Sequence, residues 1–215
     1  MVGIIGGLSY ESTGYYYDKI NRIVAQELGG LHSADLLIRS LDFYEIEKLQ
    51  SAGEWEALEK IMKIESERLL SCGADIIAVA SNTAHKPFEN LSIPMIHIAD
   101  ALVERLLEDG LRKILLIGTR FTMEEDYIKG RLIEKGIDVE VPAETKLIDD
   151  IIFNELCKGI VKEESKKQLE RIVSGRHCVL GCTELNMLLS GDNYYDSASI
   201  HAEAIARYII DSVRK

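Results

Sequence analysis

Apolar runs of strand length alternate with longer stretches of helical period along most of the 215-residue chain. Alternation of this kind is typical of βαβ units and of a mostly parallel sheet. Several helical stretches end at a glycine, which readily adopts the conformation that closes a helix. The sequence therefore predicts an α/β fold, with strands at residues 2–6, 34–40, 75–80, 95–98, 113–118, 137–141 and 177–181. The predicted helices lie at residues 12–28, 54–72, 99–109, 122–135, 162–173 and 199–213.

The order of features repeats along the chain. The first half opens with a strand that ends in Gly6-Gly7 and later reaches Ser81-Asn82-Thr83 at a strand end. The second half opens with a strand that ends in Gly118-Thr119 and later reaches Cys182-Thr183-Glu184. We therefore expect two similar α/β lobes, residues 1–98 and 99–198. The C-terminal helix, residues 199–215, can pack on the first lobe, although the pattern alone leaves either lobe open.

Composition and charge exclude several classes of protein. The formal net charge is -11, which argues against a protein that binds nucleic acid or an anionic membrane surface. An anionic substrate would have to be captured by local dipoles and a few cations, because the overall field opposes it. No apolar run approaches the ~18 residues of a membrane helix, and no basic leader precedes the first strand. These features predict a cytoplasmic protein with reduced thiols.

Neither a metal nor a nucleotide cofactor is expected. Cys178 and Cys182 lie close to His177, but a second ligand pair at the spacing of a metal site is missing. The spacing of Gly3, Gly6 and Gly7 differs from the dinucleotide-binding fingerprint, and the chain has no P-loop lysine.

Cys182 is the strongest candidate for a reactive side chain. It follows Gly181, which permits close approach of a ligand, and it precedes Thr183-Glu184, a plausible first turn of a helix. A helix N-terminus would lower the pKa of the thiol and favour the reactive thiolate. The alternative is that Cys182 is a small hydrophobic residue of the core. The other three cysteines lack this setting and are predicted to be structural.

Ser81-Asn82-Thr83 permits two interpretations. Small polar residues after a strand commonly cap the next helix. Backbone N–H groups at a helix start also bind carboxylates, and ligands of open α/β sheets bind at the carboxyl ends of the strands. His85 and Lys86 would add positive charge there. Ser9, after the first strand, is open to the same two interpretations.

Several short segments, weak individually, together carry a family resemblance. The chain resembles the aspartate/glutamate racemase superfamily, and within it the amino-acid racemases that need no pyridoxal phosphate, in the branch with one active-site cysteine replaced by a hydroxyl residue. The segments span nearly the whole chain in order: Gly6-Gly7-Leu8-Ser9, Glu11-Ser12-Thr13, Tyr16-Tyr17, Ser40-Leu41-Asp42-Phe43, Glu45-Ile46-Glu47, Ser81-Asn82-Thr83-Ala84-His85-Lys86, Ile152-Phe153-Asn154-Glu155-Leu156 and Gly181-Cys182-Thr183-Glu184-Leu185.

The resemblance implies two pseudo-symmetric halves with the active site in the cleft between them. Two opposed cysteines act there in the family, one removing the α-proton and the other returning a proton to the opposite face. Racemisation without a cofactor needs such an acid–base pair, and donors that hold the carboxylate of the planar intermediate. In this chain the second cysteine is Cys182, but Ser81 occupies the first position. Ser81 can still act, the enzyme can be strongly asymmetric, or the reaction can be one-sided.

The resemblance also implies the remaining site residues. Cys182 and Ser81 are predicted to be catalytic. Family members hold the side-chain carboxylate with an arginine from the first half and a lysine from the second, for which Arg39 and Lys158 are candidates. The predicted substrate-binding residues are Ser9, Gln50, Asn82, Thr83, Ala84, Thr183 and Glu184.

The sequence thus leads to one functional hypothesis and two alternatives. The hypothesis is a cytoplasmic, cofactor-independent racemase of aspartate or glutamate, a homodimer without nucleic-acid or membrane partners. The first alternative is a one-sided isomerase or decarboxylase of a related dicarboxylate. The second is a catalytically weak protein that binds an amino acid.

Overall fold

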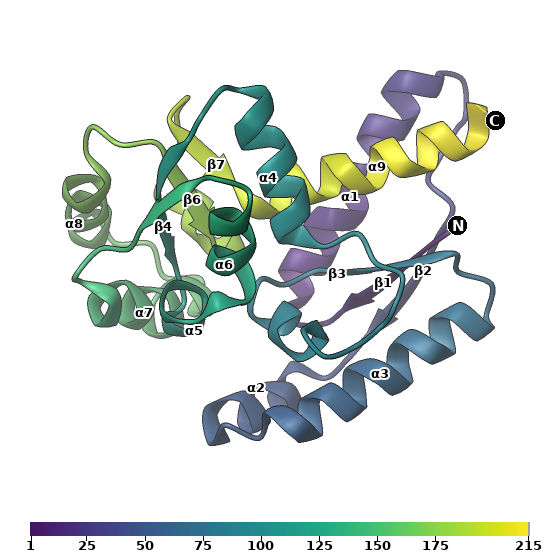
Figure 1. Cartoon of the computed structure of the whole chain (residues 1–215), viewed down its shortest axis with the longest axis horizontal. Coiled ribbons are helices and arrows are strands. Elements are labelled where there is room, and N and C mark those ends of the chain that lie inside the picture. The colour runs from purple at the N-terminus through teal and green to yellow at the C-terminus, as the bar shows by residue number, and fades with distance from the viewer. Residues whose placement is uncertain (215) are drawn as a thin grey trace. The chain divides into compact units, whose positions relative to one another are not determined.

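The structure, a computed structural model, describes residues 1–214 and contains two parallel β-sheets (Figure 1). The first sheet has the strand order β2-β1-β3, and the second has the order β5-β4-β6-β7. Every strand pair is parallel, so the predicted α/β class is confirmed. The strands are β1 (Val2–Gly6), β2 (Leu36–Ser40), β3 (Ile76–Val79), β4 (Lys113–Gly118), β5 (Asp138–Glu140), β6 (Cys178–Gly181) and β7 (Tyr194–Asp196).

Helices connect these strands, as a parallel sheet requires. None of the helices described within residues 1–214 is long and apolar enough to cross a membrane. The α-helices are α1 (Tyr10–Leu28), α2 (Phe43–Ala52), α3 (Trp55–Ser71), α4 (Ile98–Glu108), α5 (Arg120–Glu124), α6 (Asp126–Glu134), α7 (Thr145–Asn154), α8 (Glu163–Val173) and α9 (Ser197–Arg214). Short 3-10 helices are η1 (Thr83–Phe88), η2 (Leu156–Lys158) and η3 (Thr183–Met187).

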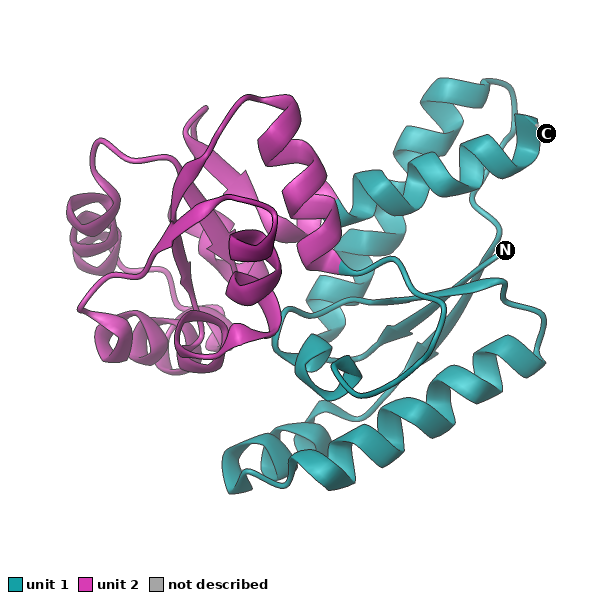
Figure 2. Cartoon of the chain, in the orientation of Figure 1, with its two compact units in different colours: residues 1–97, 201–215 teal, residues 98–200 magenta. Residues whose placement is uncertain are grey.

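The chain divides into two compact units (Figure 2). The first unit contains Met1–His97 and, at the end of the chain, residues 201–214. The second unit is Ile98–Ile200. Helix α9 begins in the second unit, and most of its length belongs to the first. Lys215, the last residue of the predicted C-terminal helix, lies outside the described residues.

The core of the first unit follows from the alternation of side chains along its strands. All residues of β1 are buried. Ile5, Ile77 and Val79 belong to one apolar cluster with residues of α2 and α3. Because successive side chains of a strand point to opposite faces, Ile4 and Ala78 face the other side of the sheet. The sheet is therefore covered on both faces, as parallel sheets are.

The second unit is built in the same way around β4 and β6. Leu115, Ile117, Cys178 and Leu180 lie in one buried cluster with apolar residues of α7 and α8. The intervening residues of these strands are also buried, so this sheet too has two covered faces. Both β4 and β6 end at a buried glycine, and the two glycines are paired in the parallel register.

Some predicted elements were wrong. Residues 95–98 form only a single bridge, from Met95 to Ile77, since α4 already begins at Ile98. The predicted helix at 122–135 is two helices, α5 and α6, because Glu125 between them is extended. Helices α2 and α7 and strand β7 were not predicted from the sequence.

Candidate functional site

The turn after β1 is held by a network of short polar contacts. Thr13 Oγ1 accepts a hydrogen bond from Gly7 N–H at 2.8 Å and donates to the Ser9 carbonyl at 3.0 Å. Ser9 caps α1, because its Oγ accepts from Ser12 N–H at 3.2 Å. Its φ of 142° is unusual for a residue with a side chain. Strained backbone of this kind is often found at functional sites.

A side chain at Gly7 would disrupt this turn. The φ of Gly7 is 74°, and a Cβ there would overlap the main chain of Leu41. Ser12 Oγ donates to the Ala80 carbonyl at 3.1 Å and so joins α1 to the residue before Ser81. The structure thus brings the predicted residues Ser9 and Ser81 onto the same edge of the first sheet, where β1 and β3 end.

The segment after β3 is more tightly held than the sequence suggested. Ser81 is partly exposed, whereas the next residues, Asn82, Thr83 and Ala84, are buried at 5%, 9% and 0% exposure. Ser81 Oγ accepts a long hydrogen bond of 3.4 Å from Ala84 N–H. The helix expected at Thr83 is the short 3-10 helix η1 rather than an α-helix. Carboxylate binding by this segment stays a prediction, now at the start of a 3-10 helix.

The segment after β6 holds a hydrogen-bonded thiol. Cys182 is 9% exposed, and its Sγ donates to Glu184 Oε2 at 3.0 Å. Thr183 Oγ1 donates to the same carboxylate oxygen at 2.6 Å. The three predicted residues Cys182, Thr183 and Glu184 therefore form one local cluster.

The expected ionisation of Cys182 was wrong. Burial raises the pKa of the Cys182 thiol well above its ordinary value, and the negative charge of Glu184 raises it further. The following helix, η3, is a five-residue 3-10 helix, and the backbone N–H of Glu184 lowers the pKa less than burial and charge raise it. The thiol is therefore protonated at neutral pH, and it can act as a base only when a neighbour takes up its proton.

Close contact between β4 and β6 positions this cluster. A Cβ at Gly118 would lie 2.8 Å from the Gly181 carbonyl oxygen, and one at Gly181 would lie 2.9 Å from Thr122 Cγ2. Thr119 caps α5 by accepting from Thr122 N–H at 3.4 Å. The turn after β4 thus repeats the design of the turn after β1, with a glycine against a threonine of the next helix.

Thr119 and Thr122, both buried, were not predicted as site residues. The signal was present in the repeat, because Gly118-Thr119 occupies the position of Gly6-Gly7 in the second half. Their hydroxyl groups bond to each other at 3.2 Å, and Thr122 also bonds to the Tyr127 hydroxyl at 2.8 Å.

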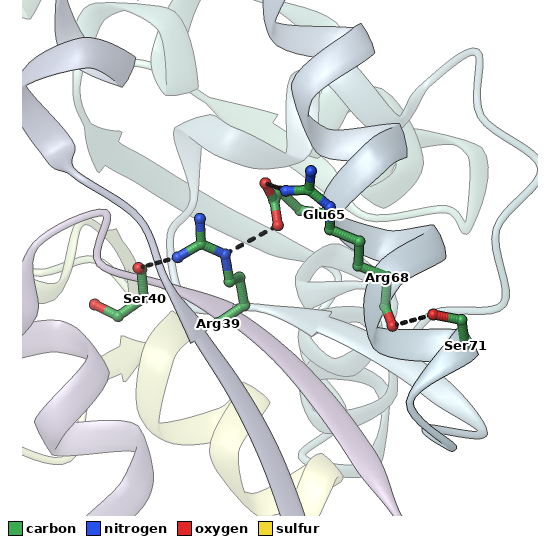
Figure 3. Close-up of polar contacts among 5 residues, drawn as sticks. All are labelled: Arg39, Ser40, Glu65, Arg68 and Ser71. Carbon is green, nitrogen blue, oxygen red and sulfur yellow. Dashed lines mark hydrogen bonds and ion pairs between the residues drawn. The ribbon is translucent and has the colours of Figure 1, made fainter.

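Arg39, the first-half candidate for binding a carboxylate, is engaged elsewhere (Figure 3). Its Nε donates to Glu65 Oε2 at 3.0 Å, and its guanidinium also donates to the Ser40 carbonyl at 2.8 Å. Arg68 bonds the other oxygen of Glu65 at 2.7 Å. Glu65 is buried, and its charge is therefore balanced by two arginines that are more exposed. We conclude that Arg39 stabilises the β2–α3 contact.

The remaining candidates for substrate binding, Lys86, Gln50 and Lys158, lie in different surroundings. Lys86 stacks on the ring of Trp55, 3.7 Å from its centroid. Gln50 is 7% exposed and lies on the buried face of α2 with Ile46. Lys158 is exposed at the end of η2, and η2 contacts η3, which begins directly after Cys182. Lys158 therefore remains the better candidate for a substrate-binding cation.

The first unit also has a groove of about 590 Å³ between α1 and α9. Charged side chains of both signs line it, among them Lys19, Arg22 and Glu203. Lys19 pairs with Glu203 across it at 2.9 Å. None of the predicted site residues lies in this groove.

Comparison with known proteins agrees with the fold. Residues 5–205 match the family model described as Asp/Glu/Hydantoin racemase. A Yersinia pestis protein solved as a candidate Asp/Glu racemase is 38% identical, with a TM-score of 0.89 and coverage of 97% of this chain and 98% of that one. An aspartate racemase homologue from Pyrococcus horikoshii is 36% identical, with a TM-score of 0.80 and the same coverage.

A curated relative is more distant in sequence. The broad specificity amino-acid racemase RacX of Bacillus subtilis is 23% identical over 209 residues, which cover 88% of this chain and 87% of that protein. The family model spans almost the whole chain, including every segment described above from Ser9 to Glu184. The chain therefore belongs to the Asp/Glu/Hydantoin racemase family.

Proposed function

We propose that the protein racemises an acidic amino acid, aspartate or glutamate, by proton transfer at Cα without a cofactor. Cys182 is the principal acid/base, and Ser81 acts on the opposite face of the same carbon. The observation that carries the proposal is the hydrogen bond from Cys182 Sγ to Glu184 at a strand end, in a chain of a racemase family.

Glu184 supplies what a buried thiol lacks. A protonated thiol can return a proton to a carbanion, but it removes an α-proton only after losing its own. The Glu184 carboxylate, 3.0 Å from the sulfur, is placed to accept that proton. Thr183 fixes the carboxylate by donating to the same oxygen. The Cys182–Glu184 pair thus shares one proton, and we propose that this pair serves one face of the substrate.

Ser81 is suited to giving a proton rather than taking one. Its Oγ accepts from Ala84 N–H, which leaves the hydroxyl hydrogen available to the substrate. A serine hydroxyl is a much weaker base than a thiolate, and no carboxylate acceptor is bonded to it in the described structure. We therefore propose an asymmetric enzyme, in which the proton transfer that uses Ser81 as base limits racemisation.

Substrate binding is assigned to the polar residues around these two groups. We propose that Ser9, Asn82 and Thr83 hold the α-carboxylate and that Lys158 pairs with the side-chain carboxylate. The names of two relatives, an aspartate racemase homologue and a broad specificity amino-acid racemase, support an amino-acid substrate. A cytoplasmic homodimer remains our expectation for the assembled protein.

Hydrogen exchange at Cα tests the proposal. The protein is incubated in deuterium oxide with L- and D-aspartate and L- and D-glutamate, and with one neutral and one basic amino acid. Chiral chromatography with mass detection then follows label and configuration together. We expect deuterium in both enantiomers of at least one acidic amino acid. Label in one enantiomer without inversion would indicate a one-sided enzyme, and binding without exchange would reject catalysis.

A further inference from the structure

A cluster of three buried histidines in the first unit contacts Ser81 through His85. His85, His97 and His201 are 0%, 2% and 0% exposed. The rings of His85 and His97 are 4.5 Å apart between centroids, and those of His85 and His201 are 5.6 Å apart. The proposed reaction assigns none of them a role. Buried imidazoles are costly unless they are hydrogen-bonded, so their partners indicate their function.

His85 replaces a main-chain hydrogen bond. In an α-helix the Ser81 carbonyl would accept from the N–H of residue 85. Here the N–H of His85 bonds to the Asn82 carbonyl at 3.1 Å, as in a 3-10 turn. The Ser81 carbonyl instead lies 2.7 Å from Nδ1 of the His85 ring. The imidazole of His85 therefore donates to the Ser81 carbonyl in place of the main-chain N–H of residue 85.

The partners determine the tautomers of two rings. A carbonyl oxygen only accepts, so Nδ1 of His85 must carry the hydrogen that it donates to Ser81. Nε2 of His201 donates to the Ile96 carbonyl at 2.8 Å for the same reason. Burial lowers the pKa of His201 to about 4, so its ring is neutral and Nδ1 is an acceptor. The Tyr16 hydroxyl, 3.0 Å away, therefore donates to it.

We propose that His85 is a positioning residue for Ser81, holding the Ser81 carbonyl with Nδ1–H while the His97 and His201 rings keep the imidazole in place. Ser81 lies between β3, which ends at Val79, and η1, which begins at Thr83. The main chain is held before Ser81 by the bond from Ala80 N–H to the Ile5 carbonyl and after it by the bond to His85. Losing the bond lets the peptide after Ser81 rotate and moves the hydroxyl. This inference rests on the proposed function, because it assigns His85 a role through Ser81.

Two substitutions at one position separate the hydrogen bond from the packing. His85→Asn keeps an N–H donor close to the place of Nδ1 but removes the ring. His85→Phe keeps a ring but removes the donor. We expect His85→Phe to lower the kcat of racemisation by about 10–100-fold, the usual effect of misplacing a reacting group by about 1 Å, with a much smaller change in KM. His85→Asn should retain a larger share of kcat, and His32→Asn, at an exposed histidine, should match the wild type.

Exchange without inversion provides a readout that loss of folding would not mimic. Cys182 and Glu184 can remove and return a proton on their own face, so this exchange should persist in His85→Phe while racemisation falls. Equal loss of both processes in folded His85→Phe, a wild-type kcat in that variant, or equal loss in His85→Asn would overturn the inference.

A measurement on the unmodified protein keeps the inference testable if the variants fail to fold. Long-range 15N NMR should show the Nδ1-protonated tautomer for His85 and the Nε2-protonated tautomer for His201. The opposite tautomer at His85 would overturn the inference. Absence of any Cα exchange in the wild type would instead reject the proposed function, while the NMR result would still report the bond to Ser81.

Discussion

The two buried cysteines of the second unit permit a matched test of the catalytic assignment. Cys178 and Cys182 lie in the same apolar cluster, at 0% and 9% exposure. Alanine removes one sulfur atom from each. A comparable loss of one buried methylene-sized group costs about 0.5–1.5 kcal/mol. Cys182→Ala also loses the hydrogen bond to Glu184, worth about 0.5–1.5 kcal/mol, although Thr183 still bonds that carboxylate.

Both variants should therefore remain folded, since a domain is commonly stable by about 5–15 kcal/mol. Their activities should differ sharply. Loss of a group that transfers a proton in the transition state lowers kcat by about 10²–10⁴-fold, so we expect a decrease of that size for Cys182→Ala. Cys178→Ala should keep a kcat close to that of the wild type, because its sulfur lies in the core and the variant loses only packing and a long hydrogen bond of 3.8 Å to the Val179 carbonyl.

Urea unfolding and chiral chromatography of aspartate and glutamate measure the two effects on the same preparations. The free energy of unfolding should fall by a similar amount in both variants, with at most about 1.5 kcal/mol more for Cys182→Ala. An activity of Cys182→Ala close to that of the wild type would refute the assignment of Cys182. So would a loss of activity in Cys178→Ala as large as that in Cys182→Ala.

Three further predictions concern other groups. Ser81→Cys should speed racemisation because a thiol ionises to the basic thiolate far more readily than a hydroxyl ionises. An unchanged rate in the chiral assay would make Ser81 a cap only. Glu184→Gln should lower the pKa of the Cys182 thiol by removing the adjacent charge, which pH-dependent iodoacetamide labelling followed by peptide mass spectrometry measures; an unchanged profile contradicts it. The pKa of His201 is about 4 in the folded protein, compared with 6.5 for an ordinary histidine, so the unfolded chain takes up a proton first as the pH drops. The free energy of unfolding should therefore fall by about 3 kcal/mol between about pH 6.5 and pH 4. In urea unfolding, the free energy of unfolding of His201→Gln should depend less on pH than that of the wild type. An identical pH dependence would argue against a neutral buried ring.

The elements predicted well are those with an unambiguous local pattern. The bounds of β1 and β4 agree with the prediction, because each is a continuous apolar run that ends at a glycine where the chain must turn. Residues 95–98 are also mostly apolar, with His97 as the exception, but they form only one bridge. The preceding Pro94 has no N–H to donate, and the helix begins at Ile98. The local sequence pattern does not show whether a neighbouring strand is available for pairing.

The sequence by itself determined the fold class, the repeat and the strand ends that carry Ser81 and Cys182, since these depend on hydrophobic period and on residue order. Only the tertiary structure decided how those groups are held. Arg39 of β2 donates a hydrogen bond to Glu65 of α3. Burial and the charge of Glu184 raise the pKa of the Cys182 thiol, whereas the sequence predicted a lowered pKa. Glu184 is close to Cys182 in the sequence, but the burial of the thiol comes from packing with apolar residues of β4 and α7. Tertiary packing therefore sets the ionisation of a group whose position the sequence already indicates.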